Sequence, residues 1–285
     1  MRLITFLGEK GHTMVGLEQG DFVRPLLGYA SALEFLEAGE KGIKNAEALL
    51  AAPDAERIPL AAVKLLAPIP RPPRIFAIGL NYAEHAVESK MKPQSVPTVF
   101  FKLSSSVVGP DADVILPYNS MQVDYEAELA VVIGTPGYRI SAADAEAHIF
   151  GYTICNDVSA RDVQLATTQW SMGKSFPTFT PLGPRIVSKD EIPDPHNLQI
   201  CCDVGGERLQ DSNTKHLIFR IPQLIEYLSS ITPLEAGDIL STGTPHGVGM
   251  GRIPPRWLRP GEEMVVTIEK IGALRNRTVA ETVPA

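Results

Sequence analysis

The chain has 285 residues, 44% of them hydrophobic and 21% charged, so it can bury a large core and is not disordered. Its net charge of -7 and its lack of any basic cluster argue against a nucleic-acid partner. No segment approaches the roughly 18 consecutive apolar residues needed to span a bilayer, and the first residues lack a signal-peptide pattern, so we expect no membrane partner.

The three cysteines, Cys155, Cys201 and Cys202, form no CxxC motif and no paired framework. Such usage suits a reducing compartment, and we therefore expect a cytoplasmic location. We expect all three side chains to be small hydrophobic members of the core.

Residues 1–70 are predicted to form a small α+β domain. Two short strands precede a helix in which Ser31 and Glu34 have the spacing of a capping box, and a second helical patch follows. The segment 68–74, PIPRPPR, has four prolines in seven positions, so it is expected to be extended or a linker.

Residues 71–285 are predicted to form a second, strand-rich domain. Three helices, NYAEHAVESK, SAADAEAHI and IPQLIEYLSSI, interrupt the strands. Many strands with few helices favour a mixed α/β, β-rich fold of the sandwich or roll type over a doubly wound one. The predicted strands are RIFAIGL, TVFFKL, ELAVVIG, FGYTICND, GPRIVS, NLQICCDV, DILSTG and EEMVVTIEKI.

The stretch VDYEAELAVVIG, residues 123–134, combines acidic residues with a strand pattern. Asp124, Glu126 and Glu128 share one side of the strand, because strand side chains alternate with a period of two. The apolar run 129–133 that follows is typical of a strand buried on both faces. Like charges at the entrance to a buried strand are costly unless a cation offsets them, although a solvated strand face is the simpler alternative.

A further acid weakens that alternative. Asp157 follows the strand FGYTICND, where it is well placed to provide a third ligand beside Glu126 and Glu128. Three carboxylates without histidine or cysteine nearby favour Mg²⁺ or Mn²⁺ over zinc, and they leave coordination positions open for substrate oxygens. A structural Ca²⁺ site in a protein without catalytic activity remains a third interpretation.

The helix in residues 79–89, GLNYAEHAVES, carries a candidate general base. Asn81 is expected to cap it, and His85 and Glu88 lie three residues apart on one face. A histidine backed by a carboxylate is the arrangement of a general base, although a surface helix with an incidental pair would have the same spacing.

Two other segments have possible binding roles. Lys174 lies between small residues amid aromatic neighbours, where it is either an anion-binding cation or a surface lysine. The glycine-rich segment STGTPHGVG, residues 241–249, is not GxGxxG, so it is either a carboxylate-binding loop or a plain turn. The absence of GxSxG and Walker A motifs weakens serine-hydrolase and NTPase readings.

These segments, in this order and spacing, resemble the fumarylacetoacetate hydrolase family over residues 75 to about 280. The segments that carry the resemblance are GLNYAEHAVE, PTVFFKLSSSVVGP, VDYEAELAVVIG, GYTICNDVSARDVQ, QWSMGKSF and LSTGTPHGVG. The resemblance implies a mixed β-sandwich roll, with the small N-terminal domain as an extension.

The resemblance also implies roles for ten residues. It implies metal ligation by Glu126, Glu128 and Asp157, with Asp124 as a supporting residue. It implies a catalytic dyad of His85 and Glu88 and a catalytic, substrate-contacting Lys174. The residues that it implies for substrate binding are Arg161, Gln164 and Thr244.

One difference from the family pattern indicates which branch of the family this chain resembles. The enzyme that names the family has a fourth acidic ligand seven residues before the catalytic histidine, and Ile78 stands there in this chain. The shorter, three-carboxylate branch is usually dimeric, so we expect a homodimer. We expect an Mg²⁺-dependent hydrolase that cleaves a C–C bond in a small anionic 2,4-dioxo acid such as an acylpyruvate. The alternative is an oxaloacetate decarboxylase or a keto–enol tautomerase on the same metal site.

Overall fold

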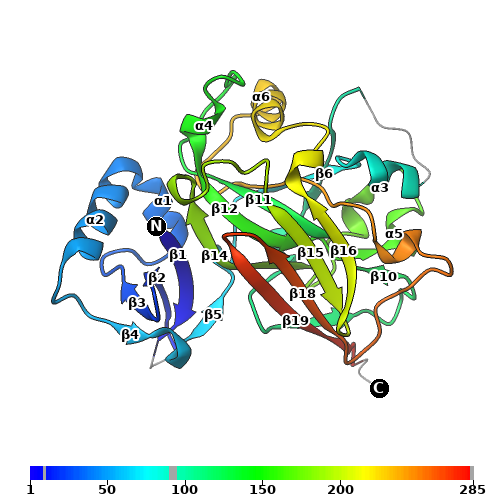
Figure 1. Ribbon diagram of the computed structural model, residues 1–285, viewed down its shortest axis with the longest axis horizontal. Coiled ribbons are helices and arrows are strands. Elements are labelled where there is room, and N and C mark those ends of the chain that lie inside the picture. The colour runs from blue at the N-terminus through cyan, green and yellow to red at the C-terminus, as the bar shows by residue number, and fades with distance from the viewer. Residues whose placement is uncertain (9–10, 90–94, 283–285) are drawn as a thin grey trace.

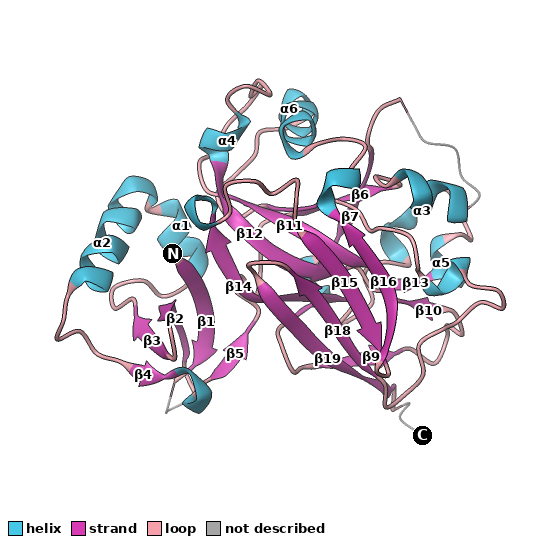
Figure 2. Cartoon of the chain, viewed as in Figure 1, coloured by secondary structure: helices cyan, strands magenta, loops and turns pink. Residues whose placement is uncertain are grey.

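The computed structural model describes residues 1–8, 11–89 and 95–282. Within these residues the strands form a 12-stranded sheet, a five-stranded sheet and a two-stranded ribbon (Figure 1). Most helices lie at the edges and ends of the sheets rather than in layers that cover both faces (Figure 2). The predicted mixed, β-rich fold is therefore confirmed.

The N-terminal part of the chain extends the large sheet. Its strands are β1 (Arg2–Leu7), β2 (Thr13–Gln19), β3 (Phe22–Pro25), β4 (Ile58–Pro59) and β5 (Lys64–Leu66). Two helices, α1 (Ala32–Glu37) and α2 (Gly39–Ala51), pack beside them, and the Ser31 side chain caps α1 by accepting from Glu34 N at 3.1 Å. Because β1 pairs with β14 (Thr180–Ser188), residues 1–70 are hydrogen-bonded to the rest of the molecule.

The large sheet continues through the strands that hold the predicted site. Their order from β14 is β14, β12, β11, β17, β6 and β7, which makes β7 an edge strand. The strands are β6 (Ile75–Gly79), β7 (Thr98–Lys102), β8 (Val107–Val108), β11 (Ala127–Ile133), β12 (Ile149–Asn156) and β17 (Ile239–Ser241). The two-stranded ribbon, β10 (Val123–Asp124) with β13 (Ser159–Ala160), lies where β11 begins and β12 ends.

The five-stranded sheet packs against one face of the large sheet. Its strands are β9 (Asp113–Leu116), β15 (Gln199–Val204), β16 (Glu207–Asn213), β18 (Glu263–Ile268) and β19 (Gly272–Ala280), in the order β16, β15, β18, β19, β9. One hydrophobic cluster joins the two sheets and includes Leu129 and Val131 of β11, Ile200 of β15 and Val266 of β18.

Strand β11 is buried on both faces, as its continuous apolar run predicts. Leu129 and Val131 contact the five-stranded sheet, whereas Ala130 and Val132 belong to a second cluster with Leu3 of the N-terminal part. Because side chains alternate along a strand, one side of β11 serves the sandwich core and the other side serves the N-terminal packing.

The described residues of the second part of the chain contain four helices: α3 (Ala83–Glu88), α4 (Ala145–His148), α5 (Arg161–Gln164) and α6 (Ile221–Ile231). Helix α6 buries one face, as predicted. The predicted N-cap of α3 is wrong: Tyr82 holds that position, and the Asn81 side chain instead bonds the backbone of Phe219 and Thr242. Short 3-10 helices lie at Leu60–Ala62, Ser104–Ser106, Trp170–Met172, Lys189–Glu191, Thr214–His216 and Gly249–Gly251.

The cysteine prediction is confirmed, since Cys155, Cys201 and Cys202 are buried and free. No helix in the described part of the chain is long and apolar enough to cross a membrane.

Candidate active site

The register of β11 and β12 brings the three predicted metal ligands together. Ala127, the first residue of β11, pairs with Asn156, the last residue of β12. The residues just outside this pair, Glu126 and Asp157, therefore meet, and the Asp157 amide donates to the Glu126 carbonyl at 2.9 Å. Ligand oxygens of Glu126, Glu128 and Asp157 all lie within 4.8 Å of one another, and all three side chains are buried. We call these three residues the carboxylate cluster.

In the described part of the chain, three buried cations bond two acids of the carboxylate cluster, Glu126 and Asp157. Lys174 Nζ donates to Glu126 Oε2 and Asp157 Oδ2, both at 2.7 Å. The Arg161 guanidinium contacts Glu126 Oε1 at 2.6 Å, and Lys102 Nζ contacts Asp157 Oδ1 at 2.6 Å. Because a buried charge is costly unless it is paired, these contacts offset the cost of burying Glu126 and Asp157.

Lys102 was not predicted from the sequence. It is the last residue of edge strand β7, its side chain is fully buried, and it also donates to the Lys174 carbonyl. The signal in the sequence was the alternation of side chains along the strand, which places Lys102 on the opposite side from Phe101. If Phe101 is on the exposed side, Lys102 is buried, and a buried lysine needs an acidic partner.

The two glutamates of the cluster differ in their electrostatic surroundings. Burial raises the pKa of Glu126, but Arg161 and Lys174 outweigh that effect and hold it well below its ordinary value. Glu128 accepts from Ser241 Oγ at 2.5 Å and from the Gly243 amide at 3.0 Å, and no cation bonds it in the described structure. Burial and the charges of Asp157 and Glu126 raise the pKa of Glu128 to about 8.

The carboxylate cluster fits a divalent cation. Its donors are carboxylate oxygens, which Mg²⁺ and Mn²⁺ prefer. The Lys174 ammonium already lies between two of the three acids, so this position selects for positive charge. The raised pKa of Glu128 marks the side of the cluster where the negative charge is least compensated.

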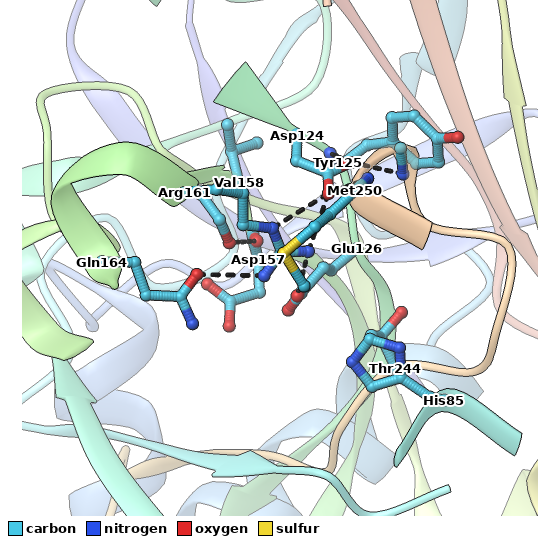
Figure 3. Close-up of polar contacts among 12 residues, drawn as sticks. His85, Asp124, Tyr125, Glu126, Asp157, Val158, Arg161, Gln164, Thr244 and Met250 are labelled. Carbon is cyan, nitrogen blue, oxygen red and sulfur yellow. Dashed lines mark hydrogen bonds and ion pairs between the residues drawn. The ribbon is translucent and has the colours of Figure 1, made fainter. Parts of the chain in front are cut away.

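Asp124 bonds groups that surround the carboxylate cluster, and its expected role as a supporting residue rather than a ligand stays a prediction. Its Oδ1 accepts from the Gly249 amide at 2.7 Å, and its Oδ2 accepts from Arg161 Nε at 2.9 Å and the Met250 amide at 3.0 Å (Figure 3). A Cβ at Gly249 would lie 2.0 Å from the Arg256 carbonyl, so only glycine lets this backbone approach so closely. Asp124 thereby fixes Arg161 against the carboxylate cluster.

The two residues of the predicted dyad lie together on α3. His85 Nδ1 lies 3.4 Å from Glu88 Oε2, and the Glu88 carboxylate accepts from the Gly247 amide at 3.0 and 3.1 Å. Gly251 packs against the same carboxylate, because a Cβ there would lie 2.1 Å from Glu88 Cγ. Since Nδ1 faces Glu88, Nε2 is the nitrogen of the His85 ring that remains for chemistry in the pocket.

One pocket joins the dyad to the carboxylate cluster. Of the nine predicted site residues, seven line it, while Glu88 and Asp157 bond the lining residues His85 and Lys174. The seven are His85, Glu126, Glu128, Arg161, Gln164, Lys174 and Thr244. Most of the other lining residues have apolar side chains, including Ile78 at the position of the missing fourth acid.

The three predicted substrate-binding residues are placed differently from one another. The Arg161 guanidinium is occupied by Asp124, Glu126 and Gln164, so it holds other side chains in place. Gln164 Oε1 accepts from Arg161 Nη1 at 3.0 Å, which leaves its amide nitrogen to the pocket. Thr244 lies near His85 in the pocket wall (Figure 3). Contact of any of these residues with substrate stays a prediction.

A β-sandwich with a buried carboxylate cluster beside a histidine–glutamate dyad defines a class of metal-site enzymes, and the comparisons give the family. The model described as fumarylacetoacetate (FAA) hydrolase C-terminal matches residues 74–279. The chain belongs to the fumarylacetoacetate hydrolase family, a family of enzymes.

Curated relatives and solved structures agree with this family. The chain is 46% identical to the mitochondrial oxaloacetate tautomerase Fahd2a of Rattus norvegicus over 290 residues, which cover 98% of this chain and 92% of the rat protein. A fumarylacetoacetate hydrolase from Exiguobacterium antarcticum is 34% identical with a TM-score of 0.86, over 99% of this chain and 100% of that one. A maleylpyruvate hydrolase from Sphingobium, solved with manganese(II) and pyruvate, is 29% identical with a TM-score of 0.83 at the same coverage.

Proposed function

We propose that this protein is a metal-dependent tautomerase that interconverts the keto and enol forms of oxaloacetate. The observation that carries the proposal is the 46% identity, over 98% of the chain, to an oxaloacetate tautomerase. This identity favours the alternative prediction from the sequence, which includes a keto–enol tautomerase, over the C–C bond hydrolase that we expected first. The pocket agrees with a small dianionic substrate, because the buried cations Arg161 and Lys174 line it beside the carboxylate cluster.

Mg²⁺ or Mn²⁺ is the proposed cofactor, held by Glu126, Glu128 and Asp157. When bound, it would act as a Lewis acid and as a template for the 1-carboxylate and 2-oxo oxygens of the substrate. The identity of the ion is part of the proposal, which the manganese complex of the Sphingobium relative supports.

In the keto-to-enol direction, His85 Nε2 would remove one proton from C3 of the substrate. Glu88 would hold the ring through Nδ1 and stabilise the imidazolium that forms. The electron pair of the broken C–H bond becomes the C2–C3 double bond, and the carbonyl pair moves to O2. Lys174, which lines the pocket beside the carboxylate cluster, would stabilise this oxygen before a proton returns to it and gives the enol.

The charge balance of the site supports a dianionic substrate. Among the described residues of the site, four buried carboxylates, Asp124, Glu126, Glu128 and Asp157, face three buried cations, Lys102, Arg161 and Lys174. The ionised group therefore carries one net negative charge, and a divalent cation would make it positive by one. A substrate with two carboxylates would then be attracted, which is what oxaloacetate provides.

Hydrolysis of a 2,4-dioxo acid is the second candidate, because the Sphingobium relative is named as a maleylpyruvate hydrolase. In that reaction His85 would take a proton from water, and the hydroxide would attack the distal carbonyl. Oxaloacetate lacks a distal ketone, so the two reactions need different substrates. Decarboxylation of oxaloacetate is separated from both by its product, CO₂.

The test follows the ultraviolet absorbance of enolised oxaloacetate as it converts to the keto form, with Mg²⁺ and with EDTA. Mg²⁺-dependent acceleration without release of CO₂ is the expected result. Acetylpyruvate is the matched substrate for the second candidate, and its cleavage to acetate and pyruvate would establish hydrolysis. No acceleration with oxaloacetate, from folded protein that binds Mg²⁺, would overturn the tautomerase proposal.

A further inference from the structure

Gln210 is a buried polar residue of β16 that the site description does not yet use. Its side chain is fully buried, and its amide makes three hydrogen bonds. Oε1 accepts from the Ala127 amide at 2.9 Å, while Nε2 donates to Thr244 Oγ1 at 2.8 Å and to the Pro245 carbonyl at 2.9 Å. It thus connects the strand of the carboxylate cluster to the loop that carries Thr244.

The orientation of this amide is fixed by backbone groups at both ends. The Ala127 amide can only donate, so the oxygen of Gln210 must face it. The Pro245 carbonyl can only accept, so the nitrogen must face it. A rotation of the amide by half a turn would place donor against donor and acceptor against acceptor, in the core, at two sites at once.

This fixed amide determines the direction of the Thr244 hydrogen bond. One N–H of Gln210 is used by Pro245, and the other points at Thr244 Oγ1, which must accept it. The Thr244 hydroxyl proton therefore cannot be used on Gln210, and no acceptor takes it in the described parts of the structure. Since Thr244 lines the pocket, its proton is available to a ligand there.

We propose that Gln210 is a positioning residue that makes Thr244 a hydrogen-bond donor to a carboxylate of the substrate. Ala127, which Gln210 also binds, lies between Glu126 and Glu128, so the same side chain fixes the distance from the Thr244 hydroxyl to the carboxylate cluster. This inference rests on the proposed function for its choice of ligand, a small dicarboxylate held beside the cluster.

The test is a double-mutant cycle with Gln210→Met and Thr244→Val, read as kcat/KM for oxaloacetate. Loss of a hydrogen bond to a charged acceptor predicts that Thr244→Val lowers kcat/KM about 10-fold or more, mainly through KM. Gln210→Met should cause a comparable loss in the wild-type background and less than about a twofold further loss in the Thr244→Val background. Thr244→Ser, which keeps the hydroxyl, should retain most of the activity.

Two variants separate positioning from simple support of the fold. Asn276→Leu removes another buried amide, which donates to the carbonyls of Gly109 and Ala112, and should lower the melting temperature without changing KM. If Gln210→Met does not fold, Gln210→Glu serves in its place. Its oxygen keeps the bond to the Ala127 amide but cannot donate to both Thr244 and Pro245, so the same loss in kcat/KM is expected.

Equal losses from Gln210→Met in both Thr244 backgrounds would overturn the inference, as would an unchanged kcat/KM. If neither the wild type nor any variant turns over oxaloacetate, the proposed function is wrong. The same double-mutant cycle is then measured as dissociation constants for malate in the presence of Mg²⁺. Malate carries both carboxylates and cannot enolise. Coupled losses of malate binding would still support the positioning role, whereas additive losses, or no binding by the wild type, would contradict it.

Discussion

The carboxylate cluster and the His85–Glu88 dyad face one pocket but are built in different ways. The cluster lies where two paired strands end, and buried cations hold its oxygens. The dyad lies on α3, a helix of six residues that depends on contacts with the loop at Gly247. The comparison shows that paired strands position the carboxylate cluster, whereas the proposed general base lies on a short helix outside the sheet.

Breaking the carboxylate cluster should have the largest effect. Asp157→Asn removes an ionised ligand and takes away the partner that Lys102 and Lys174 share. We expect Mg²⁺ affinity to fall by more than about 100-fold, with loss of turnover, since even residues behind a ligand affect affinity on that scale. The unpaired lysines should also cost about 3–5 kcal/mol of unfolding free energy. Calorimetry with Mg²⁺ and thermal unfolding measure both effects.

The matched control is Asp238→Asn. Asp238 is also a fully buried acid, and it is bonded to Arg74 at 3.0 and 2.5 Å, away from the pocket residues. The Asp238→Asn variant should be less stable than the wild type but should bind Mg²⁺ with the same affinity. Equal Mg²⁺ affinities for wild type and Asp157→Asn would remove Asp157 from the ligand set.

Breaking the dyad should reduce turnover but not metal binding. His85→Asn removes the general base, and we expect kcat to fall about 10²–10⁴-fold. Mg²⁺ affinity should stay within about twofold, because His85 bonds Glu88 rather than the carboxylate cluster. His148→Asn is the control, since His148 lies on the short helix α4 and bonds the Thr135 carbonyl. Near-normal turnover by His85→Asn would contradict the role of the dyad.

The raised pKa of Glu128 predicts how metal and protons compete in the cluster. At pH 7 the metal-free protein should hold a proton on Glu128, whose pKa is near 8, and should release it when Mg²⁺ binds. Calorimetry in buffers of different ionisation enthalpy measures this release. Release that does not decrease between pH 7 and pH 9 would contradict the assignment.

The raised pKa of Glu128 also predicts the direction in which the stability of the metal-free protein changes with pH. The pKa of Glu128 in the folded state, about 8, lies above the ordinary value of 4.5, so the folded protein binds the additional proton between these values. The contribution of Glu128 to stability is therefore complete below pH 4.5 and lost as pH rises to about 8, by up to about 1.4 kcal/mol per pH unit. Thermal unfolding of the metal-free protein, with Glu128→Gln as the comparison, measures it.

The smallest effect is expected at the outer edge of α3. Glu84 Oε2 lies 2.7 Å from His246 Nδ1, but the side chain of Glu84 is 66% exposed and that of His246 44%. Exposed ion pairs contribute little, so Glu84→Gln should change kcat and the melting temperature only slightly. Glu88→Gln, at the buried contact with Gly247, should lower kcat about 10-fold or more. Equal effects of the two variants would mean that α3 is not held through Glu88.

The sequence was sufficient to predict the three acids of the carboxylate cluster and the strands next to them. A period of two placed Glu126 and Glu128 on one side, and an acid at a strand end indicated Asp157. The strand 272–280 was missed because its buried side includes Asn276 and Thr278, which look exposed in a hydrophobicity pattern. They are buried because they bond the backbone carbonyls of neighbouring loops.

The cations of the site were harder to predict. Lys102 and Lys174 are separated by 72 residues along the chain, and only the folded sheet brings both to Asp157. Asn81 had the spacing of a helix cap, but two distant backbone segments compete for its amide. Local rules therefore identified which residues carry charge, while long-range contacts determined which charges meet.

The most direct test of this division of roles is solvent deuterium incorporation at C3 of oxaloacetate, trapped by enzymatic reduction to malate. With Mg²⁺ in D₂O, the wild-type protein should place deuterium at one C3 position well above the uncatalysed rate, and His85→Asn with Mg²⁺ bound should not. Equal, stereospecific incorporation by both proteins would contradict the account, because the proton at C3 would then move without the base on α3.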